Sequence, residues 1–423
     1  MDKLFAKLYG NDDKDIEHQK NRYKEILEKH KELFPQNTEK IQFFSTPGRT
    51  EVGGNHTDHN HGRVLAAGVN LDGVAAAAKS GDSVITVYSK GYDGAFVVDT
   101  NDLEIKEEEQ ETTSALIRGI AARFKELGYN VGGFNAYIAS DVLGGSGLSS
   151  SACIEVLLGT ILNYLYNDGQ IDVQQLAMIG QYAENVYFGK PCGLMDQMAC
   201  AVGGFVTIDF KDPEKPIVRK IEFGIENQNY SLLVVDTGGN HADLTDDYAS
   251  IPGEMKAVAQ VLGAQVCREL TKDQVIANIS LLREKVNDRA VLRVLHFFNE
   301  NERVAEQVKA LEEGNFQEFL SLVKDSGNSS WKWLQNCYTT HNPLEQSVTL
   351  ALALTEDFIN KIGEGACRVH GGGFAGTIQV FLPTDKVKDY IDEIEPILGE
   401  GAVTVLSIRP VGTIKIDLDE SDF

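Results

Sequence analysis

GGSGLSSSA, residues 144–152, separates two segments of different periodicity. FNAYIAS at 134–140 precedes it and is predicted to be a strand, and CIEVLLGTILNYLY at 153–166 follows it and is predicted to be a buried helix. Glycines let successive backbone N–H groups face one point, and the first turn of a helix adds unpaired N–H donors and a positive dipole end. A strand, a glycine turn and a buried helix in this order predict an anion site, whose usual occupant is phosphate.

The glycine turn lacks the Gly-Lys-Ser/Thr ending of a Walker P-loop, so a lysine does not supply its positive charge. Its serine hydroxyls can instead ligate or orient a magnesium ion. The other interpretation is a tight strand-to-helix turn whose serines cap the helix, and on this motif alone both interpretations stay open. The residues of this candidate anion site are Gly144, Gly145, Ser146, Gly147, Leu148, Ser149 and Ser150.

A second polar segment, TPGRTEVGGNHTDHNHG, occupies residues 46–62. It carries arginine, asparagine, aspartate and histidine side chains between glycines, a density of polar groups that a plain surface loop seldom needs. We interpret it as a substrate pocket. His56, Asp58, His59 and His61 also permit a zinc site, although consecutive loop residues rarely converge on one ion. A loop of mutually hydrogen-bonded side chains is the third interpretation.

Two further segments carry candidate chemistry. Glu184 falls on a predicted helix, and Asp196 follows a Pro-Cys-Gly turn. Phosphoryl transfer needs one group to hold Mg²⁺ and another to accept the proton of the attacking hydroxyl, and these two acids can divide the tasks. VHGGGFAG at 369–376 has enough glycine for a ligand or another segment to approach its backbone closely, or for a simple glycine hairpin.

Helices and strands alternate without a regular βα rhythm, which favours an α+β fold over a doubly wound parallel sheet. Periodicity predicts helices at 14–34 and 113–127, and KDPEKP at 211–216 is typical of a linker. We therefore expect an N-terminal domain at 1–215 and a C-terminal domain at 216–423. A return of the last strand, GTIKIDL, to the N-terminal sheet stays open.

Composition narrows the class of partner. The chain has 423 residues, 42% of them hydrophobic and 24% charged, and its formal net charge is −24. That charge argues against nucleic acid or an anionic membrane as the main partner. No run approaches the roughly 20 apolar residues of a membrane span, so we expect a cytoplasmic protein. Six cysteines without a CxxC pair predict free, mostly buried thiols.

In this order, the four segments resemble the galactokinase branch of the GHMP kinase superfamily over about residues 40–385. PGRTEVGGNHTDHNHG resembles the family's PGRxNLxGEHTDYNGG, and GLSSSA matches letter for letter. The acid segment resembles AEHxFxGxPCGxMDQ, and GGGFAG resembles GGGFGG. The resemblance implies a two-domain GHMP kinase fold, with an N-terminal mixed-sheet domain of the ribosomal protein S5-like kind and a C-terminal ferredoxin-like α+β domain.

The resemblance also implies roles for individual residues. Asp196 is expected beside the anomeric hydroxyl of a sugar, with Arg49 near it and near the transferring phosphoryl group. Ser151 and Glu184 are expected to hold Mg²⁺, and the backbone from Gly144 to Ser150 to wrap the phosphates of ATP. The residues expected at the sugar hydroxyls are His56, Asp58, Gly193 and Tyr248.

Three departures from the family pattern lie near the expected sugar side. Asn55 replaces a glutamate, Glu51 replaces an asparagine, and ASIPGE at 249–254 replaces a basic run. Asn55 can still hydrogen-bond a C6 hydroxyl, so galactose remains allowed, but an asparagine would also tolerate an acidic C6 group. The expected activity is ATP-dependent phosphorylation of galactose at the anomeric hydroxyl by a monomeric enzyme. The alternatives are a kinase for a related sugar such as galacturonate, a catalytically silent sugar and ATP sensor, and a zinc hydrolase.

Overall fold

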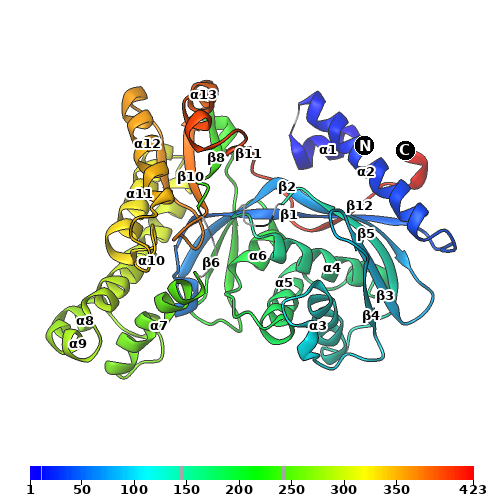
Figure 1. The fold of residues 1–423 in the computed structure, drawn as a ribbon, viewed down its shortest axis with the longest axis horizontal. Coiled ribbons are helices and arrows are strands. Elements are labelled where there is room, and N and C mark those ends of the chain that lie inside the picture. Colours follow the sequence, from blue (N-terminus) through cyan, green and yellow to red (C-terminus); the bar gives the residue numbers. More distant parts are fainter. Residues whose placement is uncertain (11, 143, 145–146, 240–243) are drawn as a thin grey trace.

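The protein contains two β-sheets with helices around them (Figure 1). The computed structural model describes residues 1–423 except 11, 143, 145–146 and 240–243. One sheet is mixed and the other is antiparallel, and the helices are gathered in groups instead of alternating with the strands. The predicted α+β class is confirmed.

The larger sheet has eight strands, and the path β12-β1-β2-β5-β3-β4 runs across it. The strand β6 pairs with β2 and the strand β7 with β6. Because β3 and β5 run parallel while the other pairs are antiparallel, the sheet is mixed. Its strands are β1 (Gln42–Gly53), β2 (Arg63–Lys79), β3 (Val84–Ser89), β4 (Ala95–Asp99), β5 (Phe134–Ser140), β6 (Phe205–Asp209), β7 (Ile217–Ile221) and β12 (Ile414–Ile416).

Alternation along β1 and β2 divides their side chains between two helical layers. Phe43 and Ala76 contact the layer formed by α1 (Asp2–Tyr9) and α2 (Asp13–Leu33). Phe44 and Ala75, one position along, contact the opposite layer. That layer is formed by α3 (Thr113–Glu126), α4 (Ser150–Tyr166) and α5 (Val173–Tyr182) (Figure 1). Since both faces of the sheet are covered, β2 is apolar on both sides.

The smaller sheet has the order β11-β8-β10-β9 with every neighbouring pair antiparallel. The helices α12 (Ser347–Ile362) and α13 (Val387–Leu398) cover one of its faces. Two strand–helix–strand units interleaved in this way give the predicted ferredoxin-like arrangement. The strands are β8 (Tyr230–Asp236), β9 (Ala366–Val369), β10 (Thr377–Pro383) and β11 (Val403–Leu406).

A group of helices is inserted between β8 and β9, and it stands beside the smaller sheet in Figure 1. It contains α7 (Thr245–Val261), α8 (Lys272–Ala277), α9 (Ile279–Lys285), α10 (Asp288–Glu312) and α11 (Phe316–Ser329). The other face of the smaller sheet contacts α11 and strands of the larger sheet through one continuous apolar core, so the two halves of the chain are joined without a gap in packing.

Three local features differ from, or add to, the sequence-based expectation. Residues 211–216, expected to be a linker, connect β6 to β7 as a hairpin turn. Residues 47–53 of the polar segment continue strand β1, with irregular pairing at Pro47/Arg49 and at Glu51/Gly53. The strand β12 does return to the larger sheet, where Ile416 lies opposite Phe43. The domain boundary near residue 215 stays a prediction.

A buried ion network ties this returning segment to the first strands. The carboxylate of Asp72, on β2, accepts hydrogen bonds from Arg22 at 2.6 Å and from Arg409 at 2.8 Å. Burial raises the pKa of Asp72, but the two guanidinium charges and the hydroxyls of Ser45 and Tyr9 outweigh it and leave the pKa below its usual value. The carboxylate is therefore ionised and holds α2, β2 and the segment before β12 together.

The six cysteines are free, five of them buried and Cys192 half-buried, so the prediction of free thiols is confirmed. Within the described part of the chain, every helix is too short or too polar to cross a membrane.

Candidate active site

Two adjoining cavities meet where the larger sheet faces the glycine-rich segment 371–376. The first, of about 290 Å³, is lined by the start of α4 and by Glu184. The second, of about 240 Å³, is lined by residues of the polar segment and by Gly193. Arg49 and Asp196 line both cavities, so this pair stands at the boundary between them.

Arg49 and Asp196 form a bidentate ion pair. Arg49 lies on β1, where its own backbone N–H donates to the carbonyl of Leu148, and Asp196 lies in the first turn of α6 (Met195–Val202). The Nε and Nη2 atoms of Arg49 donate to the two carboxylate oxygens at 2.7 and 2.9 Å. The hydroxyl of Ser149 donates to the same carboxylate. The strand, the helix and the glycine turn therefore converge on one carboxylate, which places Asp196 and Arg49 side by side.

Burial raises the pKa of Asp196, but the charge and hydrogen bonds of Arg49 and the hydrogen bond from Ser149 outweigh it. The net pKa lies below the usual value, so Asp196 is ionised at neutral pH. The side chain of Asp196 keeps 33% of its surface exposed while that of Arg49 keeps 8%. The carboxylate is thus open to the cavities, and the guanidinium behind it is fixed.

The described part of the glycine turn ends at the start of α4. Ser149 has the left-handed φ of 58°, which turns the chain into the helix that begins at Ser150. Leu148 is buried in the core and anchors the turn from beneath. Ser149, Ser150 and Ser151, at the start of α4, line the first cavity, and the unpaired N–H groups of a helix's first turn are suited to binding phosphate. Gly144 lies in an exposed turn, and Gly145 and Ser146 lie outside the described residues.

Gly147 is the point of closest approach between this turn and the segment 369–376. A Cβ atom at Gly147 would lie 2.5 Å from Oγ1 of Thr377 and 2.8 Å from Nδ1 of His370. The φ of Gly147, 74°, also disfavours any larger residue. Only glycine lets the phosphate-side turn and the second glycine-rich segment meet here.

Ser151 and Glu184 face each other across the first cavity, with their oxygens 3.5 Å apart. Glu184 lies in a π-helical turn, Ala183–Phe188, a conformation that often occurs at functional sites. The side-chain amide of Gln197 donates to Glu184 at 2.8 Å and to Glu155 at 2.9 Å. A hydroxyl and a carboxylate oxygen are hard ligands of the kind that Mg²⁺ prefers, so these residues fit the ion.

Glu155 lies behind this pair and is fully buried. Burial and the nearby charge of Glu184 raise its pKa well above the usual value. This shift favours the neutral form of Glu155 over its carboxylate. Sequence patterns gave no sign of it, because Glu155 lies in a helix of high apolar density and outside the four segments that carried candidate chemistry.

His56, Asp58 and Gly193 line the second cavity. The Nε2 atom of His56 lies 2.9 Å from the carbonyl of Gly372, and burial lowers the pKa of His56 to about 4. This imidazole is neutral and donates to the carbonyl. A Cβ atom at residue 193 would lie 1.9 Å from Oδ2 of Asp58, so Gly193 allows Asp58 its position.

Asn55 is fully buried and does not line either cavity. Its side-chain amide donates to Glu51 at 2.9 Å and to the carbonyl of Gly371 at 2.7 Å. Its side-chain oxygen accepts from Ser330 and Asn336. All of the strong hydrogen-bonding positions of this amide are thus used within the protein.

Glu51 does line the second cavity, but 4% of its surface is exposed. It is paired with Arg368 at 2.8 Å, a residue of β9 that sequence reasoning did not single out. Burial raises the pKa of Glu51 above the usual value in spite of the opposing charges of Arg368 and Arg49. The two departures from the family pattern, Asn55 and Glu51, are therefore hydrogen-bonded to each other, and Arg368 completes the network through its ion pair with Glu51.

Tyr248, on α7, lines the first cavity instead of the second. Its hydroxyl donates to the carbonyl of Gly373 at 3.1 Å, and its ring meets Phe374 edge-on. His370 is also at the first cavity, between Thr50 and Thr377, and burial lowers its pKa well below the usual value. The sequence analysis had singled out segment 369–376 for its glycines, but it assigned no role to the imidazole of His370.

The zinc interpretation finds no support. Across the residues that the structure describes, no group of three or more His, Cys, Asp or Glu side chains could hold a metal ion. The Nε2 atom of His56 lies against the carbonyl of Gly372, whereas that of His59 lies 3.9 Å from Asp58, so these two imidazoles have different neighbours.

Known proteins with similar sequences and structures complete the description. Residues 115–204 match the family model of the GHMP kinases N terminal domain, and residues 28–79 match the galactokinase galactose-binding signature. The galactokinase of Streptomyces coelicolor is 31% identical over 84% of this chain and 88% of its own length. That of Glaesserella parasuis is 30% identical over 81% of this chain and 85% of its own length.

Solved structures of a galactokinase and of a mevalonate kinase are similar to this structure. The galactokinase of Lactococcus lactis, in its complex with galactose, superposes with a TM-score of 0.79 at 25% identity, covering 92% of this chain and 98% of that one. The mevalonate kinase of Methanococcus jannaschii gives a TM-score of 0.61 at 15% identity, covering 88% of this chain and 99% of that one, which is a likeness of fold alone.

Proposed function

The chain belongs to the galactokinase family, and from that premise we propose that it transfers the γ-phosphoryl group of ATP to the anomeric hydroxyl of galactose. The observation that carries the proposal is the position of the Arg49–Asp196 pair, which lines both the cavity at the start of α4 and the cavity of the polar segment. Nucleotide phosphates belong in the first cavity and the sugar in the second.

Asp196 accepts a hydrogen bond from the anomeric hydroxyl and directs its oxygen at the γ-phosphorus. Its lowered pKa makes it a weak base, so it orients the hydroxyl and receives the proton as the bond to phosphorus forms. Arg49 holds the carboxylate from behind and places positive charge beside the transferring group. With a loose transition state, this positioning and charge neutralisation supply most of the acceleration.

The chain's own groups also prepare the nucleotide cavity. Backbone N–H groups at the start of α4 bind phosphate oxygens, and Ser150 adds a hydroxyl beside them. Ser151 and Glu184 would hold Mg²⁺, which neutralises charge on the phosphates when bound. Gln197 fixes Glu184 in place, and Lys190, 4.0 Å from Glu184, adds a second positive charge at the mouth.

In the sugar cavity we assign hydroxyl contacts to Asp58, His56 and the backbone of Gly193. Asn55 is a positioning residue, because its amide is committed to Glu51, Gly371, Ser330 and Asn336. This assignment weakens the argument for galacturonate, which rested on direct contact between Asn55 and the C6 group. Tyr248, on the nucleotide side, closes the first cavity through Gly373.

The test is a turnover measurement with purified protein, Mg-ATP and a panel of galactose, glucose, galactosamine, N-acetylgalactosamine, arabinose and galacturonate. ADP release and formation of the sugar 1-phosphate are followed, with Asp196→Asn as the control. Strong turnover on galactose that the control abolishes supports the proposal. Turnover on galacturonate alone would transfer the assignment to that sugar, and binding of galactose and ATP without turnover would make the protein a sensor.

A further inference from the structure

Lys190 stands at the boundary between the two cavities of the candidate active site. It lines both the cavity at the start of α4 and the cavity of the polar segment, as Arg49 and Asp196 do. Among the lining residues that the structure describes, Arg49 and Lys190 are the two with an arginine or lysine side chain. The family pattern AEHxFxGxPCGxMDQ leaves this position open, so the resemblance gives Lys190 no role.

The backbone of Lys190 is held by the π-helical turn Ala183–Phe188, which carries Glu184. Its N–H group donates to the carbonyl of Glu184 at 3.1 Å, and Gly189 between them ends the turn with the left-handed φ of 86°. Pro191, the next residue, narrows the backbone conformations that are open to Lys190. The start of this long side chain is therefore fixed beside the proposed magnesium ligand.

The ammonium group of Lys190 lies close to the reacting groups but is not hydrogen-bonded to them. Its Nζ atom is 4.0 Å from a carboxylate oxygen of Glu184, beyond hydrogen-bond distance, and it donates to no atom of the described residues. Its side chain keeps 67% of its surface exposed. Burial raises the pKa of Asp196, and the charge of Lys190 adds to the effects of Arg49 and Ser149 that lower it. Three N–H donors are thus available at the boundary of the cavities.

Arg49 is already committed to other groups. Its Nε and Nη2 atoms donate to Asp196, and its Nη1 atom donates to the carbonyl of Gly147. A phosphoryl group in transfer spreads its negative charge over three oxygens, so it needs donors that can follow it. The fixed guanidinium acts on this group through its charge, and direct contact with the moving oxygens is left to the ammonium of Lys190.

We propose that Lys190 is a further catalytic residue, whose ammonium group contacts the γ-phosphoryl group during transfer and then the phosphate of the sugar 1-phosphate. This inference rests on the proposed function. In that reaction the anomeric oxygen forms a bond to the γ-phosphorus, and the bond from this phosphorus to the β,γ-bridging oxygen breaks. The electron pair of the broken bond leaves with ADP, and the hydroxyl proton goes to Asp196. Lys190 keeps its own protons and neutralises charge on the phosphoryl oxygens.

Calorimetric titration in EDTA, without metal or nucleotide, measures recognition of the phosphate apart from turnover. The full chain is titrated with galactose and, separately, with galactose 1-phosphate. Lys190→Met should bind galactose 1-phosphate at least about fivefold more weakly than the unmodified chain, with its affinity for galactose changed by less than about twofold. Lys190→Arg keeps the positive charge and should bind galactose 1-phosphate within about threefold of the unmodified chain.

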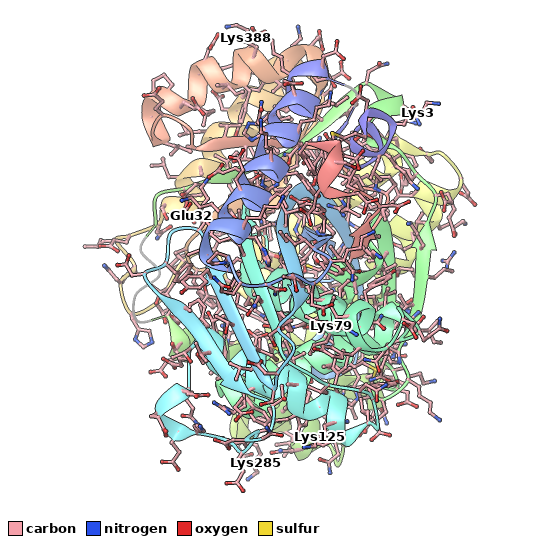
Figure 2. The ribbon with its side chains drawn as sticks, turned by 90° about the vertical axis from the view of Figure 1, so that its right-hand side faces the viewer. Lys3, Glu32, Lys79, Lys125, Lys285 and Lys388 are labelled. Atoms are coloured by element: carbon pink, nitrogen blue, oxygen red, sulfur yellow. The ribbon has the colours of Figure 1, made fainter. Side chains whose placement is uncertain are left out.

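Lys125→Met is the matched control. Lys125 is an exposed lysine near the end of α3 that lines neither cavity, and Figure 2 labels it near one end of the molecule. This variant should bind both ligands as the unmodified chain does. An equal loss in both methionine variants, or an unchanged affinity for galactose 1-phosphate in Lys190→Met, overturns the role of Lys190 and leaves the proposed kinase activity standing. A chain that binds neither ligand overturns both proposals.

Initial rates distinguish contact with the phosphoryl group from an indirect effect through Glu184. Lys190→Met should lower kcat at least about tenfold while the KM for the sugar stays within about twofold, the pattern of a contact made in the transition state. The substitution removes positive charge beside Glu184 and so does not weaken a site for Mg²⁺ there. The loss of kcat should therefore persist at high Mg²⁺. Recovery at high Mg²⁺ would mean that Lys190 acts through Glu184, and it would overturn the proposal.

Discussion

At the scale of single residues, the chemistry depends on how one carboxylate is held. Asp196 is ionised because Arg49 and Ser149 outweigh its burial, and it is oriented because both of its oxygens are bound on the protein side. Orientation and charge are therefore separable by substitution.

Asp196→Asn keeps the size of the side chain but removes its charge and its capacity to accept the proton. We expect kcat to fall by about a thousandfold, within the range usual for a positioned base, while the KM for ATP changes little. Initial-rate kinetics with both substrates varied will measure this. A loss of less than tenfold would show that Asp196 does not receive the proton.

Glu155 and Glu184 accept hydrogen bonds from the same side-chain amide, that of Gln197, but Glu184 also faces Ser151. Glu155→Gln replaces a group whose raised pKa favours the neutral form, so we expect kcat/KM to change by less than about threefold. Glu184→Gln removes a proposed magnesium ligand and should lower kcat/KM by roughly a hundredfold, recovering in part at high Mg²⁺. Magnesium titrations of both variants compare them, and equal losses would refute the distinction.

Gly193→Ala tests the sugar cavity. The added methyl group cannot coexist with Asp58, whose Oδ2 would lie 1.9 Å from it, so Asp58 must turn away. The KM for the sugar should rise about tenfold or more, corresponding to one lost polar contact of roughly 1.4 kcal/mol, with the KM for ATP unchanged. An unchanged sugar KM would remove Asp58 from the site.

At the scale of elements, two glycine-rich segments touch at Gly147 and line the proposed nucleotide cavity. The start of α4 and the segment before β10 come from opposite halves of the chain, and His370 and Thr377 occupy the contact. Their close approach sets the width of the cavity.

Gly147→Ala should therefore disturb both packing and nucleotide binding. Its positive φ and its contacts with Thr377 and His370 predict a loss of roughly 1–3 kcal/mol in the free energy of unfolding, with a higher KM for ATP. Denaturant unfolding and initial rates measure the two effects. Gly253→Ala, at an exposed position of α7 with open space for a Cβ atom, is the matched control and should leave the KM for ATP unchanged without loss of stability.

Helices and strands were predicted well from the sequence where apolar periodicity alone determines the local structure. Residues 134–140 form the expected strand, and 113–126 form nearly the expected helix, because apolar periodicity alone fixes them. Residues 47–53 were interpreted as loop because of their polar content, but β2 supplies a full-length partner strand that local patterns do not reveal. Burial of Asn55 was equally hidden, since its partners Ser330 and Asn336 lie far along the chain.

At the scale of the whole molecule, buried histidines make stability depend on pH. Burial lowers the pKa of His30, His56, His296 and His370 below the usual value near 6.5. Below that value the unfolded chain binds protons that the folded chain does not, so stability is lost as the pH falls from about 6.5 toward each folded pKa.

Each such histidine can remove up to about 1.4 kcal/mol per pH unit in that window. Glu51 and Glu155 act in the opposite direction, because their raised pKa values let the folded chain keep protons that the unfolded chain releases above about 4.5. With four histidines against two glutamates, we expect a clearly lower midpoint of thermal unfolding at pH 5.5 than at 7.5. His296→Gln should reduce the difference, and an equal midpoint at both pH values would contradict the prediction.

The pairing of β12 with β1 also governs the order in which the molecule can be completed. During synthesis β1 emerges early, yet its outer neighbour follows only after some 360 further residues, and Arg409 must arrive before Asp72 gains its second guanidinium. Until then β1 presents an unprotected sheet edge on the ribosome, the kind of edge on which chains aggregate. We therefore expect chaperones to bind the first half of the chain until synthesis is complete. We also expect the two halves to fold in a single cooperative transition.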